Sequence, residues 1–452
     1  MRPSRSIVAT LATVVAAVLF LGVCTESDLR LSGPGQFGDT STDLDPRFAT
    51  ADDVVDLALD DLAAYWTEQL PVVYGIDFEP LLGGEIAYGP TTEIPQCGPA
   101  ELDYDDVAEN ALYCPDEDLI AWDRVALTPQ LQEDFGPLTV GIVMSHEYAH
   151  AIQARAEVDG STVTLELQAD CFAGAWVADV NDRIAVFDDD GDSLDQAIGG
   201  FLELRDSVGV SGGDPSAHGS GFDRVSAFQQ GYERGNDVCV TYEDDPPTVV
   251  AIPFGSRADQ QQEGNLPLDE LIEPLLADLE SFHRALFADL GETWEPIDGV
   301  VPVDPAADLV ECGDEVLEGD DLRLASFYCV ADNTIYLDNA ELVPSLDQIG
   351  DFAVGGEIAR QYAFAAQNRL DIAGDDKEGR LHADCLTGVY AAAEFLQRIP
   401  DQQLVLSPGD IDEILIAFLT IGEDTGATAF QRTAAFRIGF VNGMTACASA
   451  YL

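Results

Sequence analysis

Two histidines and a glutamate in the first half of the chain have the spacing of a zinc site. His146 and His150 lie four residues apart in an H-E-x-x-H pentapeptide, so on a helix both imidazoles share one face and can bind one Zn²⁺. Glu147 then lies beside the open coordination position, where a carboxylate can take a proton from activated water. Apolar residues around the motif repeat at helical spacing after Pro137. The motif therefore predicts a hydrolytic zinc site, although a pentapeptide alone is a weak signal.

A second helical stretch supplies the third candidate ligand. Asp159-Gly160 is typical of a turn, and residues 165–176 again have a helical pattern. A returning helix would bring Glu166 back over the histidines and place Asp170 one turn later, where it can accept the free N–H of a ligating imidazole. Two histidines and one glutamate leave the fourth zinc position to water. The alternative is a buried helical hairpin whose acidic residues only cap helices.

These segments together resemble a known family. S-H-E-Y-A-H-A-I-Q, L-E-L-Q-A-D-C-F-A-G-A-W, A-H-G-S and G-Y-E-R-G follow one another between about residues 95 and 240, as in the bacterial neutral zinc metallopeptidases, which are gluzincin-like peptidases of the HExxH…ExxAD type. The resemblance implies a zincin-like α+β fold and hydrolysis of a peptide or protein substrate. It also implies Zn²⁺ on His146, His150 and Glu166, with Glu147 as general base. Relatives usually carry Gly-His-His where this chain has Ala-His150-Ala, which leaves both histidine ligands in place.

His218 is the candidate for a second catalytic role. It lies in a polar loop rich in glycine and serine and is one of five histidines in the chain. Zinc peptidases of this general kind use a cationic or hydrogen-bonding side chain to hold the developing oxyanion. The alternative is a loop histidine that only forms local hydrogen bonds.

The chain also contains an internal repeat. A-D-C-F-A-G at 169–174 recurs as A-D-C-L-T-G at 383–388, and the Cys-Gly pair at 97–98 recurs at 312–313. We therefore expect two tandem homologous domains, each mainly α-helical with a small β-sheet. The expected organisation is a signal peptide or membrane anchor at 1–24, a flexible spacer at 25–50, a zinc metallopeptidase domain at 51–242, a linker at 243–265 and a degenerate copy at 266–452.

Comparison of the two copies predicts that the second one is catalytically inactive. Alignment of the two copies pairs the residues of the proposed site as follows: His146 with Gly356, Glu147 with Glu357, His150 with Arg360, Glu166 with Arg380 and His218 with Gly426. The metal ligands are lost together, whereas the cysteines and glycines remain. Asp170 keeps a counterpart in Asp384, which favours Glu166 over Asp170 as the third ligand.

Composition restricts the partners of the protein. The chain has 84 acidic and 20 basic residues and a formal net charge of −64, which repels nucleic acids and anionic membranes. Hydrophobic residues make up 46% of the chain, so there is enough apolar material for two cores. Because a tandem repeat of one fold often docks pseudo-symmetrically, we also expect the two copies to pack against each other.

The N-terminus has the pattern of an export signal. Arg2 and Arg5 precede an apolar run that ends before Cys24. A cleaved signal, a lipid anchor on Cys24 and a retained membrane anchor are all open, and each gives an extracytoplasmic protein, secreted or membrane-anchored.

The other eight cysteines fall four to each copy. Outside the cytoplasm we expect disulfides. Their parallel placement favours Cys97–Cys114, Cys171–Cys239, Cys312–Cys329 and Cys385–Cys447, although other pairings within a copy are possible.

Two other functions stay open. The chain could be a non-catalytic cell-surface binding protein on a zincin-like scaffold, with a structural zinc. A fourth protein ligand such as Cys171 would indicate this, although its counterpart Cys385 favours a disulfide. In the other reading, the second copy is the functional module and docks a partner or regulates the cleft.

Overall fold

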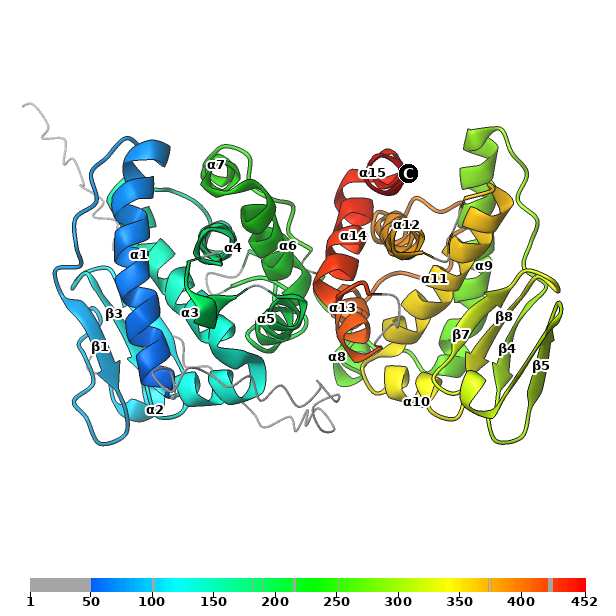
Figure 1. Cartoon of the computed structure of the whole chain (residues 1–452), viewed down its shortest axis with the longest axis horizontal. Helices are drawn as coiled ribbons and strands as arrows, with labels where there is room; N and C mark the ends of the chain where they lie inside the picture. The colour runs from blue at the N-terminus through cyan, green and yellow to red at the C-terminus, as the bar shows by residue number, and fades with distance from the viewer. Residues whose placement is uncertain are drawn as a thin grey trace, which may run out of the picture.

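The computed structural model describes residues 50–99, 102–181, 183–188, 190–213, 217–250, 252–372, 374, 376–421 and 426–452. The chain forms two lobes that lie side by side, each with strands on its outer side, while α5, α6, α13 and α14 meet at the centre (Figure 1). The predicted fold, mainly α with a small β-sheet, is confirmed. The expected signal segment with Cys24, and the spacer up to residue 49, lie outside the described residues. Within the described ranges, no helix has the length and apolarity needed to cross a membrane.

The first lobe surrounds a three-stranded sheet of order β1-β3-β2, in which β1 is parallel and β2 antiparallel to β3. All five residues of β3 are buried, because β3 is the central strand and α3 packs against it. The elements of this lobe are α1 (Ala51–Val73), β1 (Gly84–Tyr88), α2 (Tyr104–Val107), β2 (Ala111–Cys114), β3 (Leu119–Asp123), α3 (Leu127–Ala156), α4 (Thr162–Val180), α5 (Gly191–Glu203), α6 (Gly221–Arg234) and α7 (Asn236–Val240).

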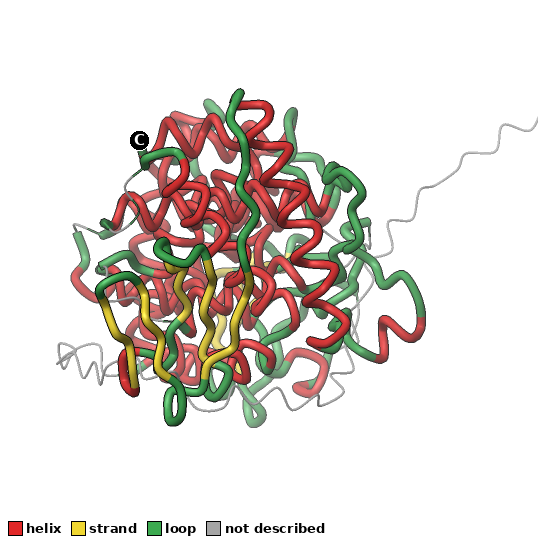
Figure 2. The backbone as a smooth tube through the Cα atoms, turned by 90° about the vertical axis from the view of Figure 1, so that its right-hand side faces the viewer, coloured by secondary structure: helices red, strands yellow, loops and turns green. Residues whose placement is uncertain are grey.

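The second lobe has a sheet of the same kind, of order β4-β8-β7, with β4 parallel and β7 antiparallel to β8. Figure 2 shows the strands of this lobe on one face, with the helices behind them. The elements are α8 (Arg257–Gln261) in the connecting segment, α9 (Leu268–Leu290), β4 (Gly299–Val303), β5 (Leu309–Cys312), β6 (Glu315–Glu318), β7 (Ser326–Cys329), β8 (Thr334–Asp338), α10 (Leu342–Asp347), α11 (Asp351–Arg369), α12 (Lys377–Phe395), α13 (Asp410–Thr420), α14 (Ala429–Asn442) and α15 (Met444–Tyr451).

The predicted helical hairpin is formed by α3 and α4. Helix α3 bends at Gly136, whose φ of 79° requires glycine or strain, and Pro137 begins the straight segment that carries the H-E-x-x-H motif. The helix ends at Glu157 in the left-handed conformation. Ser161 then caps α4, because its side chain accepts a hydrogen bond from the Thr164 N–H. The hairpin brings α4 back alongside the histidine-bearing face of α3.

Close helix crossings in both lobes depend on glycine. A β-carbon on Gly174 of α4 would lie 1.9 Å from the Phe228 carbonyl oxygen, and one on Gly231 of α6 would lie 1.7 Å from the Cys171 carbonyl oxygen. The α12–α14 crossing repeats this arrangement at Gly388 and Gly439, with 2.1 and 1.8 Å. Only glycine permits backbones to approach this closely.

Disulfides join the cysteines in the pairs that their parallel placement predicted. The bonds are Cys97–Cys114, Cys171–Cys239, Cys312–Cys329 and Cys385–Cys447. In each lobe, one bond lies in the strand region. The other bond joins α4 to α7 in the first lobe and α12 to α15 in the second.

The lobes contact each other through reciprocal helix caps. The Asp195 carboxylate on α5 accepts hydrogen bonds from the N–H groups of Ala429 and Phe430 at the start of α14, at 2.9 and 2.7 Å. The Asp412 carboxylate on α13 accepts hydrogen bonds from the N–H groups at the start of α6, at 3.0 and 2.8 Å. Each lobe therefore satisfies free N–H groups of a helix in the other lobe, an exchange typical of two-fold related subunits.

Candidate active site

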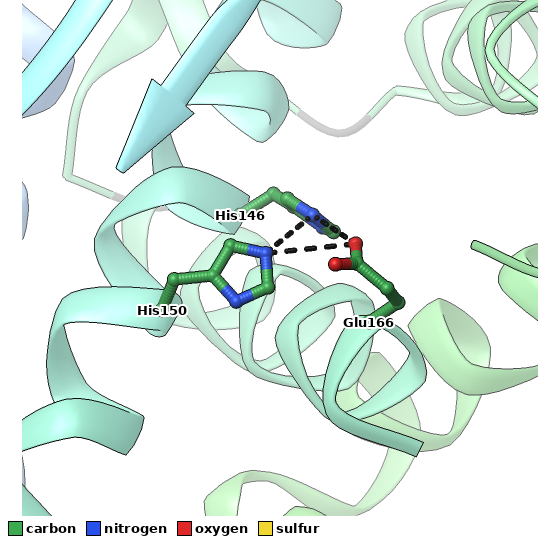
Figure 3. Close-up of side chains that lie close together, drawn as sticks. All are labelled: His146, His150 and Glu166. Carbon is green, nitrogen blue, oxygen red and sulfur yellow. Dashed lines mark hydrogen bonds and ion pairs between the residues drawn. The ribbon is translucent and has the colours of Figure 1, made fainter. Parts of the chain in front are cut away.

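Three candidate ligands from α3 and α4 point toward one another. His146 Nε2 lies 3.1 Å from His150 Nε2 and 3.0 Å from Glu166 Oε2, and His150 Nε2 lies 3.5 Å from the same oxygen. Figure 3 shows both histidines on one helix and the glutamate on the neighbouring helix. His146 is 7% exposed, so the cluster is mostly shielded from water.

The donor set fits zinc. Ligand atoms in a tetrahedral site with zinc bonds of about 2.0–2.1 Å are separated by about 3.3 Å, close to the three separations observed. Both Nδ1 atoms form hydrogen bonds elsewhere, so the two Nε2 atoms and the Glu166 oxygen are left to share a proton or a metal ion. No fourth His, Cys, Asp or Glu joins this group among the described residues. Cys171 in particular is bonded to Cys239, so one position remains for water.

Each imidazole is oriented through its Nδ1 atom. His146 Nδ1 donates to Asp170 Oδ1 at 2.7 Å, the role that the spacing predicts for this aspartate. His150 Nδ1 donates to Gln153 Oε1 at 2.8 Å. The Gln153 amide nitrogen is occupied by the Leu165 carbonyl at 2.7 Å, so its oxygen must face the histidine. Such contacts fix the tautomer and ring orientation of a metal ligand.

Gln153 and Arg224 have roles in this site that the motifs of the sequence did not reveal. Gln153 follows His150 by three residues on the same helix face, a spacing that could have indicated the contact. Arg224 donates from Nε and Nη2 to both Asp170 oxygens at 2.9 Å each. No local spacing could indicate it, because α6 follows α4 only after a long connection.

The carboxylates around the ligands favour a bound cation. Burial alone would lower the pKa of His146, but the nearby Asp170 and Glu166 carboxylates outweigh it and raise this pKa to about 10. Burial would raise the pKa of Glu166, but the two histidines hold it well below its usual range. The site therefore attracts positive charge, whether a proton or a metal ion.

Glu147 is placed as a buried base beside the ligands. It is 8% exposed and lines the same cavity as His146, His150 and Glu166. Its carboxylate accepts a hydrogen bond from the backbone N–H of Tyr113 in β2. Burial raises the pKa of Glu147. A carboxylate with a raised pKa is a stronger base and is better suited to general-base catalysis near neutral pH.

The candidate site opens into a cavity of about 850 Å³. Its wall is formed by β2, by the α3–α4 hairpin and by the loop before α6. A volume of this size accommodates several residues of a peptide and is within the range of ligand pockets.

His218 lines this cavity without contacting the three ligands. Its Nδ1 lies 3.0 Å from Asp206 Oδ1, and its backbone N–H donates to Asp206 Oδ2 at 2.7 Å. The side chain is 51% exposed. Among the described residues, the ring forms no hydrogen bond through Nε2, so this atom remains for a ligand.

The second lobe has other residues at the corresponding positions, and the structure corrects their pairing. Gln367 donates to the Gly379 carbonyl at 2.6 Å as Gln153 does to Leu165, and Arg360 donates to Asp384 at 2.6 Å in the place of His146. The residues that make equivalent contacts in the two lobes are 214 positions apart in the sequence, as Gln153 and Gln367 are, and as Asp170 and Asp384 are.

The predicted pairing of α3 with α11, at a spacing of 210 residues, is therefore wrong by one helical turn. Such a shift is hard to detect in the sequence, because residues one turn apart lie on the same face of a helix. His146 therefore corresponds to Arg360 rather than Gly356, and His150 to Phe364 rather than Arg360. Glu147 corresponds to Gln361 rather than Glu357, whereas the pairing of Glu166 with Arg380 stands. The second lobe thus lacks counterparts of Glu147 and of the three candidate ligands.

Residues 97–242 match the family described as "Putative neutral zinc metallopeptidase", and the site residues of the first lobe lie inside this range. The chain is 26% identical over 215 residues to the uncharacterized protein Rv2575 of Mycobacterium tuberculosis (strain H37Rv), covering 40% of this chain and 66% of the relative. It is 29% identical over 154 residues to the uncharacterized protein YpfJ of Escherichia coli K12, covering 26% of this chain and 52% of the relative.

The chain thus spans just under two thirds of the mycobacterial relative and about half of the Escherichia coli relative. No solved structure matches the chain. The family match is confined to the first lobe.

Proposed function

We propose that the chain is an exported zinc-dependent metallopeptidase that hydrolyses peptide bonds by metal-activated water, with Glu147 as general base. The observation that carries the proposal is the convergence of His146 Nε2, His150 Nε2 and Glu166 Oε2 at 3.0–3.5 Å beside this buried carboxylate. The second lobe is then a catalytically inactive copy with a structural or regulatory role. The family match of residues 97–242 supports the zinc and peptidase parts of the proposal.

Zinc, when bound by His146, His150 and Glu166, supplies a Lewis acid that lowers the pKa of water and polarises a peptide carbonyl. Glu147 takes the proton from the attacking water and returns it to the leaving amine. Its burial keeps bulk water from competing for that proton. His218, with Asp206 holding its Nδ1–H, can donate from Nε2 to the developing oxyanion in its protonated form.

The disulfides support export. Four bonds within the described residues fit an oxidising compartment outside the cytoplasm. We propose that the N-terminal apolar segment directs this export, either as a cleaved signal or as an anchor.

Replacement of Glu147 by glutamine tests the mechanism most sharply. Glutamine has nearly the same shape and is the residue that the second lobe carries at this position, Gln361. We expect Glu147→Gln to bind zinc as the wild type does and to lower kcat by about 10²–10⁴-fold, the usual contribution of a general base. Gln361→Glu is the matched control and should leave hydrolysis of a peptide library unchanged. Undiminished turnover in Glu147→Gln would remove Glu147 from its role.

A further inference from the structure

Three carboxylates converge in the second lobe, away from the residues of the candidate zinc site. Asp351 begins α11, and Asp410 and Glu413 lie in the first turn of α13. One oxygen from each side chain lies within 4.8 Å of the others. The three residues are 4%, 4% and 6% exposed, so their charges are almost entirely removed from water.

The hydrogen bonds of the cluster leave two oxygens without a partner. Asp351 Oδ2 accepts from the Leu266 N–H at 2.8 Å, Asp410 Oδ2 from the Ser407 N–H at 2.7 Å, and Glu413 Oε2 from the Phe352 N–H at 2.8 Å. Oδ1 of Asp351 and Oδ1 of Asp410 are buried and have no hydrogen-bond partner within the described part of the chain. Buried polar atoms are rarely left unsatisfied.

No side-chain cation balances the cluster within the described residues. No ion pair joins Arg, Lys or His to any of the three carboxylates, and the charged groups that act most strongly on them are acidic. Burial, together with repulsion from neighbouring carboxylates, raises the pKa of Glu413 to about 8 and those of Asp351 and Asp410 above their usual range. Three buried carboxylates with two free oxygens therefore require added positive charge, and a metal ion would supply it at neutral pH.

The first lobe does not contain this cluster. Glu413 packs against Gly350, where a β-carbon would lie 2.0 Å from its carboxyl carbon, and Gln196 packs in the same way against Gly136 at 2.5 Å. The positions of Asp351, Asp410 and Glu413 therefore correspond to Pro137, Ser193 and Gln196. The carboxylates are specific to the second lobe.

We propose that Asp351, Asp410 and Glu413 bind a hard divalent cation, Ca²⁺, that ties α11 to α13. An all-oxygen donor set suits Ca²⁺ rather than Zn²⁺, which favours imidazole and thiolate ligands. The three oxygens lie within 4.8 Å of one another, the proximity that a shared ion with Ca–O distances of about 2.3–2.6 Å requires. The ion would also fix the start of α13, where the neighbouring Asp412 caps α6 of the first lobe.

The test is Ca²⁺ binding to the full chain, with a variant that carries the residues of the first lobe. Asp410→Ser with Glu413→Gln removes two carboxylates. Glu292→Gln with Glu295→Gln removes two exposed ones and controls for weak binding to the acidic surface. Equilibrium dialysis with radioactive Ca²⁺ at about 0.15 M KCl, where surface charges are screened, should give one saturable site in wild type and control. The affinity of that site should fall at least 10-fold in the Asp410/Glu413 variant.

Thermal unfolding separates loss of the site from misfolding. The Asp410/Glu413 variant lacks the repulsion between carboxylates, so without Ca²⁺ it should unfold at a higher temperature than the wild type. Added Ca²⁺ should raise the unfolding temperature of the wild type and control only. Equal Ca²⁺ binding by all three proteins, or a wild-type unfolding temperature that does not respond to Ca²⁺, would overturn the proposal.

Discussion

Asp170 and Asp384 occupy corresponding buried positions on α4 and α12, and their partners differ in one respect. In the first lobe Asp170 accepts from His146 at 2.7 Å and from Arg224 at 2.9 Å. In the second lobe Asp384 accepts from Arg360 at 2.6 Å and from Arg432 at 3.2 Å. The arginine from α6 or α14 is present in both lobes, so it serves the packing of the helices.

The partner on α3 or α11 is what differs between the lobes. An arginine satisfies Asp384 directly, whereas a histidine on Asp170 leaves a second nitrogen directed into the cavity. The aspartate–arginine pair is thus part of the scaffold, and the histidine is the addition that a metal site requires.

The first prediction concerns His218, for which the second lobe has Gly426 in the sequence comparison. We expect His218→Ala to lower kcat by about 10²-fold, the usual loss when an oxyanion donor is removed, while KM and zinc content stay near wild type. Steady-state kinetics with a cleaved peptide would measure this. His283→Ala, in a buried site of the second lobe, controls for the loss of a histidine elsewhere. An unchanged kcat would leave His218 with its local bond to Asp206 only.

The second prediction compares the two buried aspartates. Asp170→Asn should weaken zinc binding by about 10–100-fold, since it removes the acceptor that orients His146. Asp384→Asn should lower the unfolding temperature but leave zinc affinity unchanged. Zinc titration against a competing chelator, run beside thermal unfolding, would separate the effects. Equal loss of zinc affinity in both variants would mean that the aspartate acts only through global stability.

The third prediction uses the exchanged helix caps. Asp412→Asn and Asp195→Asn each weaken the cap of a helix in the other lobe and should each cost about 1 kcal/mol of unfolding free energy. Only Asp412→Asn should also lower kcat, by a few-fold, because α6 begins three residues after His218. Denaturant unfolding and peptide hydrolysis would be measured on both variants. Equal activity losses would indicate that the lobes act as one cooperative unit rather than through this helix.

The smallest predicted effect concerns pH. The carboxyl of Glu413 has its pKa raised to about 8, above its unfolded value, so the folded state holds a proton that the unfolded state releases. The stability of the metal-free protein should therefore fall as pH rises from about 5 to 8. In the Asp410→Ser, Glu413→Gln variant, the drop in unfolding temperature between these pH values should be smaller than in the wild type by at least about 2 °C. A shift of this size corresponds to roughly 1 kcal/mol. Parallel slopes in the two proteins would contradict it.

The features that sequence predicts here are those set by short spacings or by the cysteine pattern that recurs in the two halves of the chain. The H-E-x-x-H pentapeptide and the Asp159-Gly160 turn fix the α3–α4 hairpin, and the hairpin brings Glu166 to the histidines. The pairing of the cysteines followed from their parallel placement in the two halves. In each case, the residues that meet lie on one helix or on adjacent helices, or the same pair of residues occurs in both copies of the repeat.

Other contacts could not be predicted, because they join segments far apart in the chain. Arg224 reaches Asp170 across 54 residues, and Asp412 reaches the start of α6 across about 190. The predicted pairing of α3 with α11 was wrong by one turn, since the H-E-x-x-H residues of α3 have different residues opposite them in α11. The repeated hydrogen bonds of Gln153 and Gln367, together with those of His146 and Arg360 to the equivalent aspartates, identify the correct pairing.

The zinc content of the purified chain without its N-terminal apolar segment would show whether His146, His150 and Glu166 form a metal site. Wild type would be measured beside His150→Ala and Glu166→Ala, each of which removes one proposed ligand. We predict about one zinc per chain in the wild type and its loss from both variants. A wild type without zinc under metal-replete conditions, or full zinc content in both variants, would contradict the assignment of this site.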